Sequence, residues 1–106
     1  MTDTMTDTMT KWCAALDALR TRDFRLNAAA ACPIREFVPG NGFIFATSFF
    51  YDAQRVADGE ERPLSTGREG KSAEALFEKA REWARYGLAY APPGWENVAS
   101  VFKTLV

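Results

Sequence analysis

The stretch most important for the fold is residues 34–51, which read IREFVPGNGFIFATSFFY. Pro39 takes the second position of a four-residue turn and a glycine follows it, a pattern typical of a type II turn. Because β-branched and aromatic residues lie on both sides, the sequence predicts a hairpin of strands Ile34–Val38 and Phe43–Tyr51. Both faces of the second strand are mostly apolar, so we expect it to be central in a sheet or covered on both sides.

Helical periodicity is found on both sides of this hairpin. Residues Thr10–Arg22 carry one apolar face, and Asp23 is positioned to cap a short second helical stretch through Ala28 to Ala31. The clearest helix is Ser72–Tyr86, with Ser72 as its N-cap and Gly87 as its C-terminal stop. The last segment, Trp95–Val106, fits either a helical face or an alternating strand, and helix is slightly favoured.

These elements predict one small α+β domain. In it, N-terminal helical segments precede the hairpin, the Ser72–Tyr86 helix packs on the sheet, and the C-terminal segment completes the core as helix or strand. The chain has 106 residues, which suits one core, so residues 10–106 are assigned to a single domain. Residues 1–9 repeat Thr-Asp-Thr-Met without apolar periodicity, which predicts a flexible low-complexity tail.

The composition excludes several function classes. The chain contains no histidine, which removes the usual general base and the commonest nitrogen ligand of zinc. We therefore predict no catalytic residues, no metal site and no cofactor. The longest apolar run is too short to cross a bilayer, and the formal charge is −1, so a cytoplasmic protein without a membrane partner is expected. Cys13 and Cys32 are predicted to be buried free thiols.

Residues 65–72, STGREGKS, nearly match a phosphate-binding loop. The full pattern needs a first glycine, and Ser65 stands in its place. The preceding residues do not form a buried strand, and Glu69 would repel a nucleotide phosphate. We therefore interpret this segment as a surface loop that ends in a helix cap.

The segment from Asn41 to Ala46 partly matches the aromatic motif with which RNA-recognition domains stack unpaired bases. The match lacks the leading basic residue, because Asn41 occupies its place, and Ile44 replaces a small residue. Phe43 and Phe45 are therefore predicted to belong to the core. Binding of single-stranded nucleic acid by this aromatic strand, with phosphates held by a basic cluster, remains the alternative function. The cluster comprises Arg20, Arg22, Arg25 and Arg35.

Acidic residues suggest a different partner. The outer face of the Ser72–Tyr86 helix carries three glutamates at a spacing of four, and more acids follow Ala57. This predicted protein-binding surface comprises Asp58, Glu60, Glu61, Glu74, Glu78 and Glu82. The leading functional prediction is a non-enzymatic protein-binding module whose partner is another protein or protein complex. It would act as a small regulator or inhibitor, as do the anti-CRISPR proteins of phages and mobile elements, although no residue specifically matches such a family.

Overall fold

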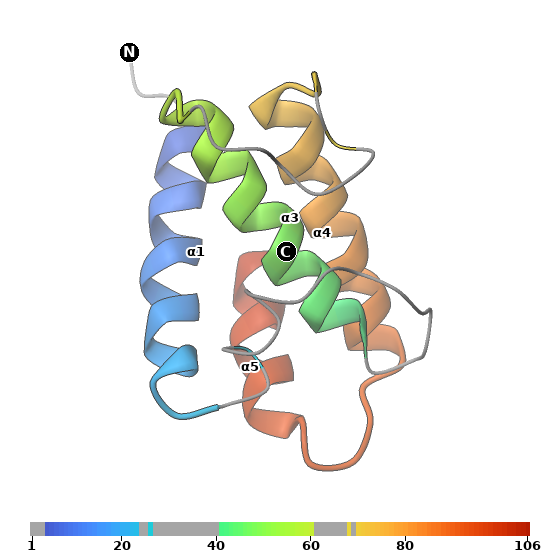
Figure 1. Cartoon of the computed structure of the whole chain (residues 1–106). Coiled ribbons are helices and arrows are strands. Elements are labelled where there is room, and N and C mark those ends of the chain that lie inside the picture. The colour runs from blue at the N-terminus through green and yellow to red at the C-terminus, as the bar shows by residue number, and fades with distance from the viewer. Residues whose placement is uncertain (1–3, 24–25, 27–40, 61–67, 69) are drawn as a thin grey trace.

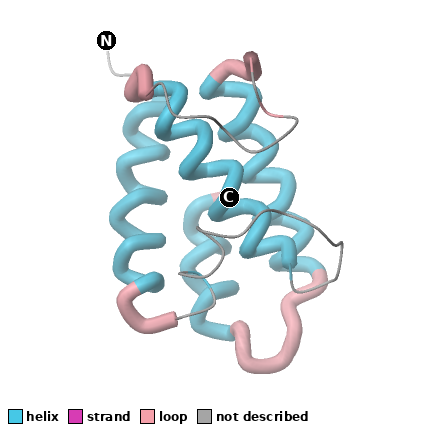
Figure 2. Tube along the Cα trace, viewed as in Figure 1, coloured by secondary structure: helices cyan, strands magenta, loops and turns pink. Residues whose placement is uncertain are grey.

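The computed structural model describes residues 4–23, 26, 41–60, 68 and 70–106. These residues form four helices, namely α1 (Thr4–Arg20), α3 (Asn41–Ala57), α4 (Ala73–Ala89) and α5 (Glu96–Leu105). In Figure 1, α3 lies between α1 and α4, and α5 contacts each of the other three. The coloured parts of Figure 2 contain helices and loops but no strand. The described part of the chain is therefore all-α, and the predicted α+β class is wrong.

The predicted strand Phe43–Tyr51 is instead part of α3. Its deeply buried residues, Phe43, Ala46, Phe50 and Ala53, repeat at spacings of three and four and thus share one face of a helix. The buried hydroxyl of Thr47 donates to the carbonyl of Phe43 at 2.8 Å, which satisfies it within the helix. Burial of this face outweighs the local β-propensity of the aromatic residues. The other predicted strand, Ile34–Val38, lies outside the described residues.

The first helix is confirmed, but it begins at Thr4, inside the segment predicted as a tail. Met9 is buried in the core and explains why the helix continues in that direction. Trp12 is at the centre of the core. Its indole contacts one aromatic ring from each of the other three helices, with ring centroids 5.2 to 5.7 Å apart, and these rings are Phe50, Phe77 and Phe102.

The predicted α4 helix and its cap are confirmed. The Ser72 hydroxyl accepts the N–H of Ala75 at 3.1 Å, which satisfies one of the free donors of the first turn. Gly87, however, does not end the helix, which continues to Ala89. It lies in the interface with α3, where a Cβ on Gly42 would come within 2.5 Å of the Gly87 Cα. The start of α3 thus meets the end of α4, and the two helices run antiparallel.

The C-terminal segment is a helix, so the strand alternative is wrong. Val98 and Phe102 are fully buried on the inner face of α5. Trp95, just before α5, stacks on Phe43 with ring centroids 5.8 Å apart. This contact holds the beginning of α5 against the beginning of α3.

Candidate functional site

The outer face of α4 carries the three predicted glutamates, and all of them are exposed. Basic side chains accompany them. Lys79 Nζ lies 3.2 Å from Glu82 Oε2, and Arg85 Nη1 lies 3.8 Å from Glu78 Oε1. With Glu74 and Arg81, the helix carries three acidic and three basic residues, so its outer face is mixed in charge rather than acidic. Exposed pairs of this kind add little stability, and their charges stay accessible to a partner.

The other predicted acids lie elsewhere. Asp58 is exposed and lines a hollow of about 280 Å³ together with Met9, Thr10 and Cys13 of α1. Glu60 is also exposed, and its Oε2 lies 3.8 Å from Arg55 Nε. Glu61 lies outside the described residues. Asp58 and Glu60 follow the last turn of α3, whereas Glu74, Glu78 and Glu82 lie on α4, so the predicted surface draws on two elements.

A series of aromatic rings, which the sequence pattern did not predict, leads from α3 along α4 to its C-terminal cap. It begins in the core, where the ring of Phe45 meets that of Trp83 edge-on at 4.5 Å. Trp83 contacts Tyr86 at 5.7 Å, and Tyr86 contacts Tyr90 at 4.8 Å. Tyr90 is 57% exposed, the most of any large hydrophobic residue in the described part of the chain. We call Phe45, Trp83, Tyr86 and Tyr90 the aromatic ladder. The spacing of Trp83, Tyr86 and Tyr90 along one helix was the signal that could have revealed it.

The structure describes two of the four predicted arginines. Arg20 Nη1 lies 4.0 Å from Asp17 Oδ1, and the Arg20 guanidinium lies 5.0 Å from the centre of the Tyr51 ring. Arg22 is exposed, and its Nε donates to the carbonyl of Ala18 at 3.4 Å. Arg25 and Arg35 lie outside the described residues. The phosphate-binding cluster of the alternative function is thus not assembled by the residues described.

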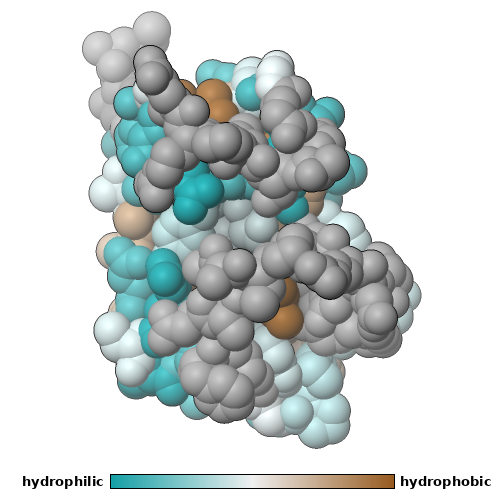
Figure 3. Space-filling view, in the orientation of Figure 1, coloured by the Kyte–Doolittle hydropathy of each residue, from teal (hydrophilic) through white to brown (hydrophobic). Residues whose placement is uncertain are grey.

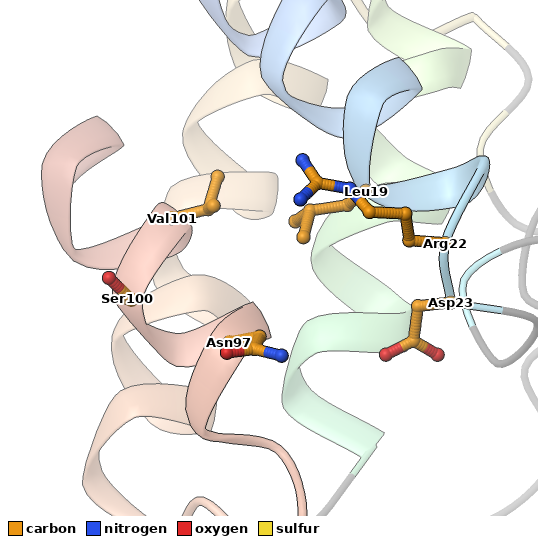
Figure 4. A pocket seen from close by; sticks show the side chains of 6 residues that line it. All are labelled: Leu19, Arg22, Asp23, Asn97, Ser100 and Val101. Carbon is orange, nitrogen blue, oxygen red and sulfur yellow. The ribbon is translucent and has the colours of Figure 1, made fainter.

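A hollow of about 300 Å³ separates the end of α1 from α5. Figure 4 shows that it is lined by Arg22 and Asp23 on one side and by Asn97 and Ser100 on the other, with Leu19 and Val101. Arg22 points toward Val101, and the amide nitrogen of Asn97 points toward the side of the hollow where Asp23 lies. Because the hollow contains one cation and one anion, it offers no net charge with which to select a ligand.

Of the near match to a phosphate-binding loop, residues 65–67 and 69 lie outside the described residues, and the rest has a structural role. Lys71 is exposed, and Ser72 caps α4 as described above. Arg68 is buried and donates to the carboxylate of Asp52 on α3. It also donates to Ser48 Oγ at 3.0 Å. The sequence analysis did not identify this buried pair, because nothing local to either residue indicates that the two come together.

The aromatic motif proposed for nucleic acid is unavailable for stacking. Phe43 is fully buried and Phe45 is 3% exposed, both within α3. Base stacking of the predicted kind needs rings on an open sheet, and the described residues contain no sheet. The prediction that Phe43 and Phe45 belong to the core is confirmed.

A polar seam joins α1 to α3. The Tyr51 hydroxyl donates to Asp17 Oδ1 at 3.0 Å, and Gln54 Nε2 donates to Cys13 Sγ at 3.4 Å. Burial raises the pKa of Tyr51 above 10.0, with Arg20 opposing the shift and Asp17 adding to it. Cys13 is a free thiol but only half-buried, less than predicted, and Cys32 lies outside the described residues.

Two features are absent from the described residues. They contain no group of three or more histidine, cysteine or acidic side chains placed to hold a metal ion. Within the same ranges, no helix has the length and apolar character needed to cross a membrane. On the face shown in Figure 3, the coloured surface is mostly hydrophilic or intermediate, with small and separate hydrophobic areas.

Comparison of the chain with protein-family models, with curated proteins and with solved structures finds no match. The narrower prediction of an anti-CRISPR-like inhibitor therefore has no support. The function must be argued from the residues themselves.

Proposed function

We propose that this protein is a non-enzymatic protein-binding module that uses the outer face and C-terminal end of α4. The observation that carries the proposal is the aromatic ladder, which leads from the buried ring of Phe45 to the exposed ring of Tyr90. Tyrosine is enriched at protein interfaces because its ring provides a large apolar area and its hydroxyl a hydrogen bond.

The aromatic ladder also lowers the conformational entropy that is lost on binding. Each ring packs on the one before it, so Tyr90 is already held in place when a partner arrives. A side chain that is ordered before association loses less conformational entropy on binding, and more of the contact energy is retained as affinity. Tyr90 is therefore suited to act as an anchor at the centre of an interface.

The charges on the outer face of α4 suit a role in selecting the partner. Glu78 and Glu82 lie on the same exposed side of α4 as Lys79 and Arg85, within salt-bridge distance of them. Charged groups at the rim of an interface mainly accelerate association and reject partners with the wrong pattern. We propose a partner surface with complementary, mixed charges.

The proposal includes no catalytic step and no cofactor, and it places the protein in the cytoplasm. The complete lack of histidine in the sequence supports a function without a catalytic step. The free thiol of Cys13 supports a cytoplasmic location, since disulfides are rare in the cytoplasm.

The test is affinity capture of the tagged protein from its native host, with and without nuclease. We expect a protein partner that survives nuclease, and we expect Tyr90→Ala to weaken its binding about tenfold or more. Lys103→Ala, an exposed change on α5, is the matched control and should bind normally. Partners that disappear with nuclease, or binding that Tyr90→Ala leaves unchanged, would refute the proposed interface.

The charges are tested separately, by association kinetics with the captured partner. Reversal of both Glu78→Lys and Glu82→Lys should change the association rate several-fold at low salt and far less at high salt, because salt screens exposed charges. Circular dichroism should show an unchanged helix content. An association rate that is the same as wild type at low salt would exclude this face as the charged rim.

A further inference from the structure

One buried ion pair connects the start of α4 to α3. Arg68 donates to Asp52 Oδ2, and both side chains are 5% exposed. The Arg68 guanidinium also lies 3.5 Å from the centre of the Phe49 ring, in a cation–π contact. The carbonyl of Arg68 accepts the N–H of Lys71 at 3.3 Å, which closes the turn before the Ser72 cap. The pair thus determines where the chain enters α4, at the same end of the molecule as the last turn of α3 (Figure 1).

A contact of this kind has two well-separated states. A buried ion pair is often no more stabilising than an apolar pair of the same shape, but removing one partner leaves a costly uncompensated charge. Partial separation of Arg68 from Asp52 is therefore unfavourable. The pair is either fully made, or fully broken with both groups solvated.

The structure also contains a substitute partner for Asp52. Arg55 Nη1 lies 3.5 Å from Asp52 Oδ1, and Arg55 is 34% exposed. Arg55 in turn lies 3.8 Å from Glu60, so it can exchange one carboxylate for the other without leaving the surface of α3. When Arg68 departs, Asp52 still has a cation beside it, and the free-energy cost of the open state is reduced.

We propose that Arg68 is a releasable anchor, which opens locally while the helical core stays folded. In the closed state it covers the Phe49 ring and binds the Ser48 hydroxyl. In the open state Arg55 neutralises Asp52, and both Phe49 and Ser48, which are partly buried in the closed state, become more exposed on α3. This gives the protein a conformational switch at the start of α4, remote from Tyr90 at the other end of the same helix.

The experiment is hydrogen exchange followed by NMR, read at the Arg68 Nη1 hydrogens, which bond Asp52 and Ser48, and at the Lys71 amide. The amide of Phe50, in the middle of the core helix α3, reports global unfolding. In Asp52→Asn we expect exchange at Arg68 and Lys71 to rise about tenfold or more, since the closed state loses its anion. Exchange at Phe50 should change much less.

Arg55→Gln distinguishes the anchor from an ordinary structural pair. Arg55 stabilises the charge of Asp52 more in the open state, where Arg68 has left, than in the closed state. Replacing Arg55 therefore disfavours the open state, and exchange at Arg68 and Lys71 should slow several-fold. Arg85→Gln on the outer face of α4 is the control and should leave both rates unchanged. Faster exchange in Arg55→Gln, or loss of protection at Phe50 together with Lys71 in Asp52→Asn, would overturn the proposal.

Discussion

The contact of α3 with α4 and the attachment of α1 to the rest of the molecule use opposite kinds of residue. Gly42 and Gly87 let the backbones of α3 and α4 approach so closely that a single added Cβ would clash. α1 has no such approach. It is held by the large side chain of Trp12 at the core and by the polar seam of Asp17 and Tyr51 at its edge.

This difference predicts different responses to mutation. Where two backbones touch, an added side-chain atom destabilises the fold, because the backbone of a packed helix cannot move aside at low free-energy cost. Where one large side chain fills the space between helices, truncating that side chain destabilises the fold, because it leaves a cavity that the helices only partly close. The α3–α4 contact should therefore be sensitive to enlargement, and the attachment of α1 to truncation.

The largest effect is expected for Trp12→Ala, which should destabilise the protein by about 3 to 5 kcal/mol. Trp12 is fully buried, and its Nε1 donates to the carbonyl of Leu105 at 3.0 Å, so the change removes both a ring and a donor. Denaturant unfolding measures the loss. Lys11→Ala, the exposed neighbour on the same helix, should stay within about 0.5 kcal/mol of wild type. A loss of less than about 1 kcal/mol for Trp12→Ala would mean that α1 is not part of the core.

An intermediate effect is expected for Gly42→Ala, a loss of about 2 kcal/mol in spite of the better helix propensity of alanine. The new methyl group would meet the backbone of Gly87 at 2.5 Å and the carbonyl oxygen of Trp83 at 2.9 Å. Gly87→Ala should cost less, because its new Cβ would lie 2.9 Å from the Phe43 ring and 3.0 Å from the Phe43 backbone nitrogen, further than the 2.5 Å contact that Gly42→Ala creates. Denaturant melts of both variants give the order. A stabilised Gly42→Ala protein would show that α3 and α4 are further apart.

The smallest effect is on the pH dependence of stability. Burial raises the pKa of Tyr51 in the folded protein, so the folded state holds this proton more tightly than the unfolded chain does. The contribution of this proton to the free energy of unfolding is fully present below about pH 10. It is lost as the pH rises through the pKa that Tyr51 has in the folded protein. Tyr51→Phe should therefore lose less stability than wild type between about pH 8 and about pH 11 in denaturant titrations. Tyr90→Phe, at an exposed position, should follow wild type, and identical curves for all three proteins would argue against a buried Tyr51.

The candidate site was only partly predictable from sequence. Exposure of Glu78 and Glu82 follows from the periodicity of α4, since Leu76 and Ala80 take the inner face. The basic partners Lys79 and Arg85 lie near in sequence, yet the pairs that form depend on rotamers. The pairing of Arg68, which precedes α4, with Asp52 of α3 joins positions 16 residues apart, and no local pattern specifies it.

By itself, the sequence determined the helices of α1 and α4, the Ser72 cap and the lack of histidine chemistry, because caps and apolar periodicity act over a few neighbouring residues. The conformation of residues 43–51 was decided only by the tertiary structure. A short apolar run suits a strand or a buried helix equally well, and alternation alone does not separate them. Packing against the other helices favoured the helix over the strand. Gly42 allows close contact with α4, and Phe43, Ala46 and Phe50 then bury one continuous helical face that a strand would have divided between two sides.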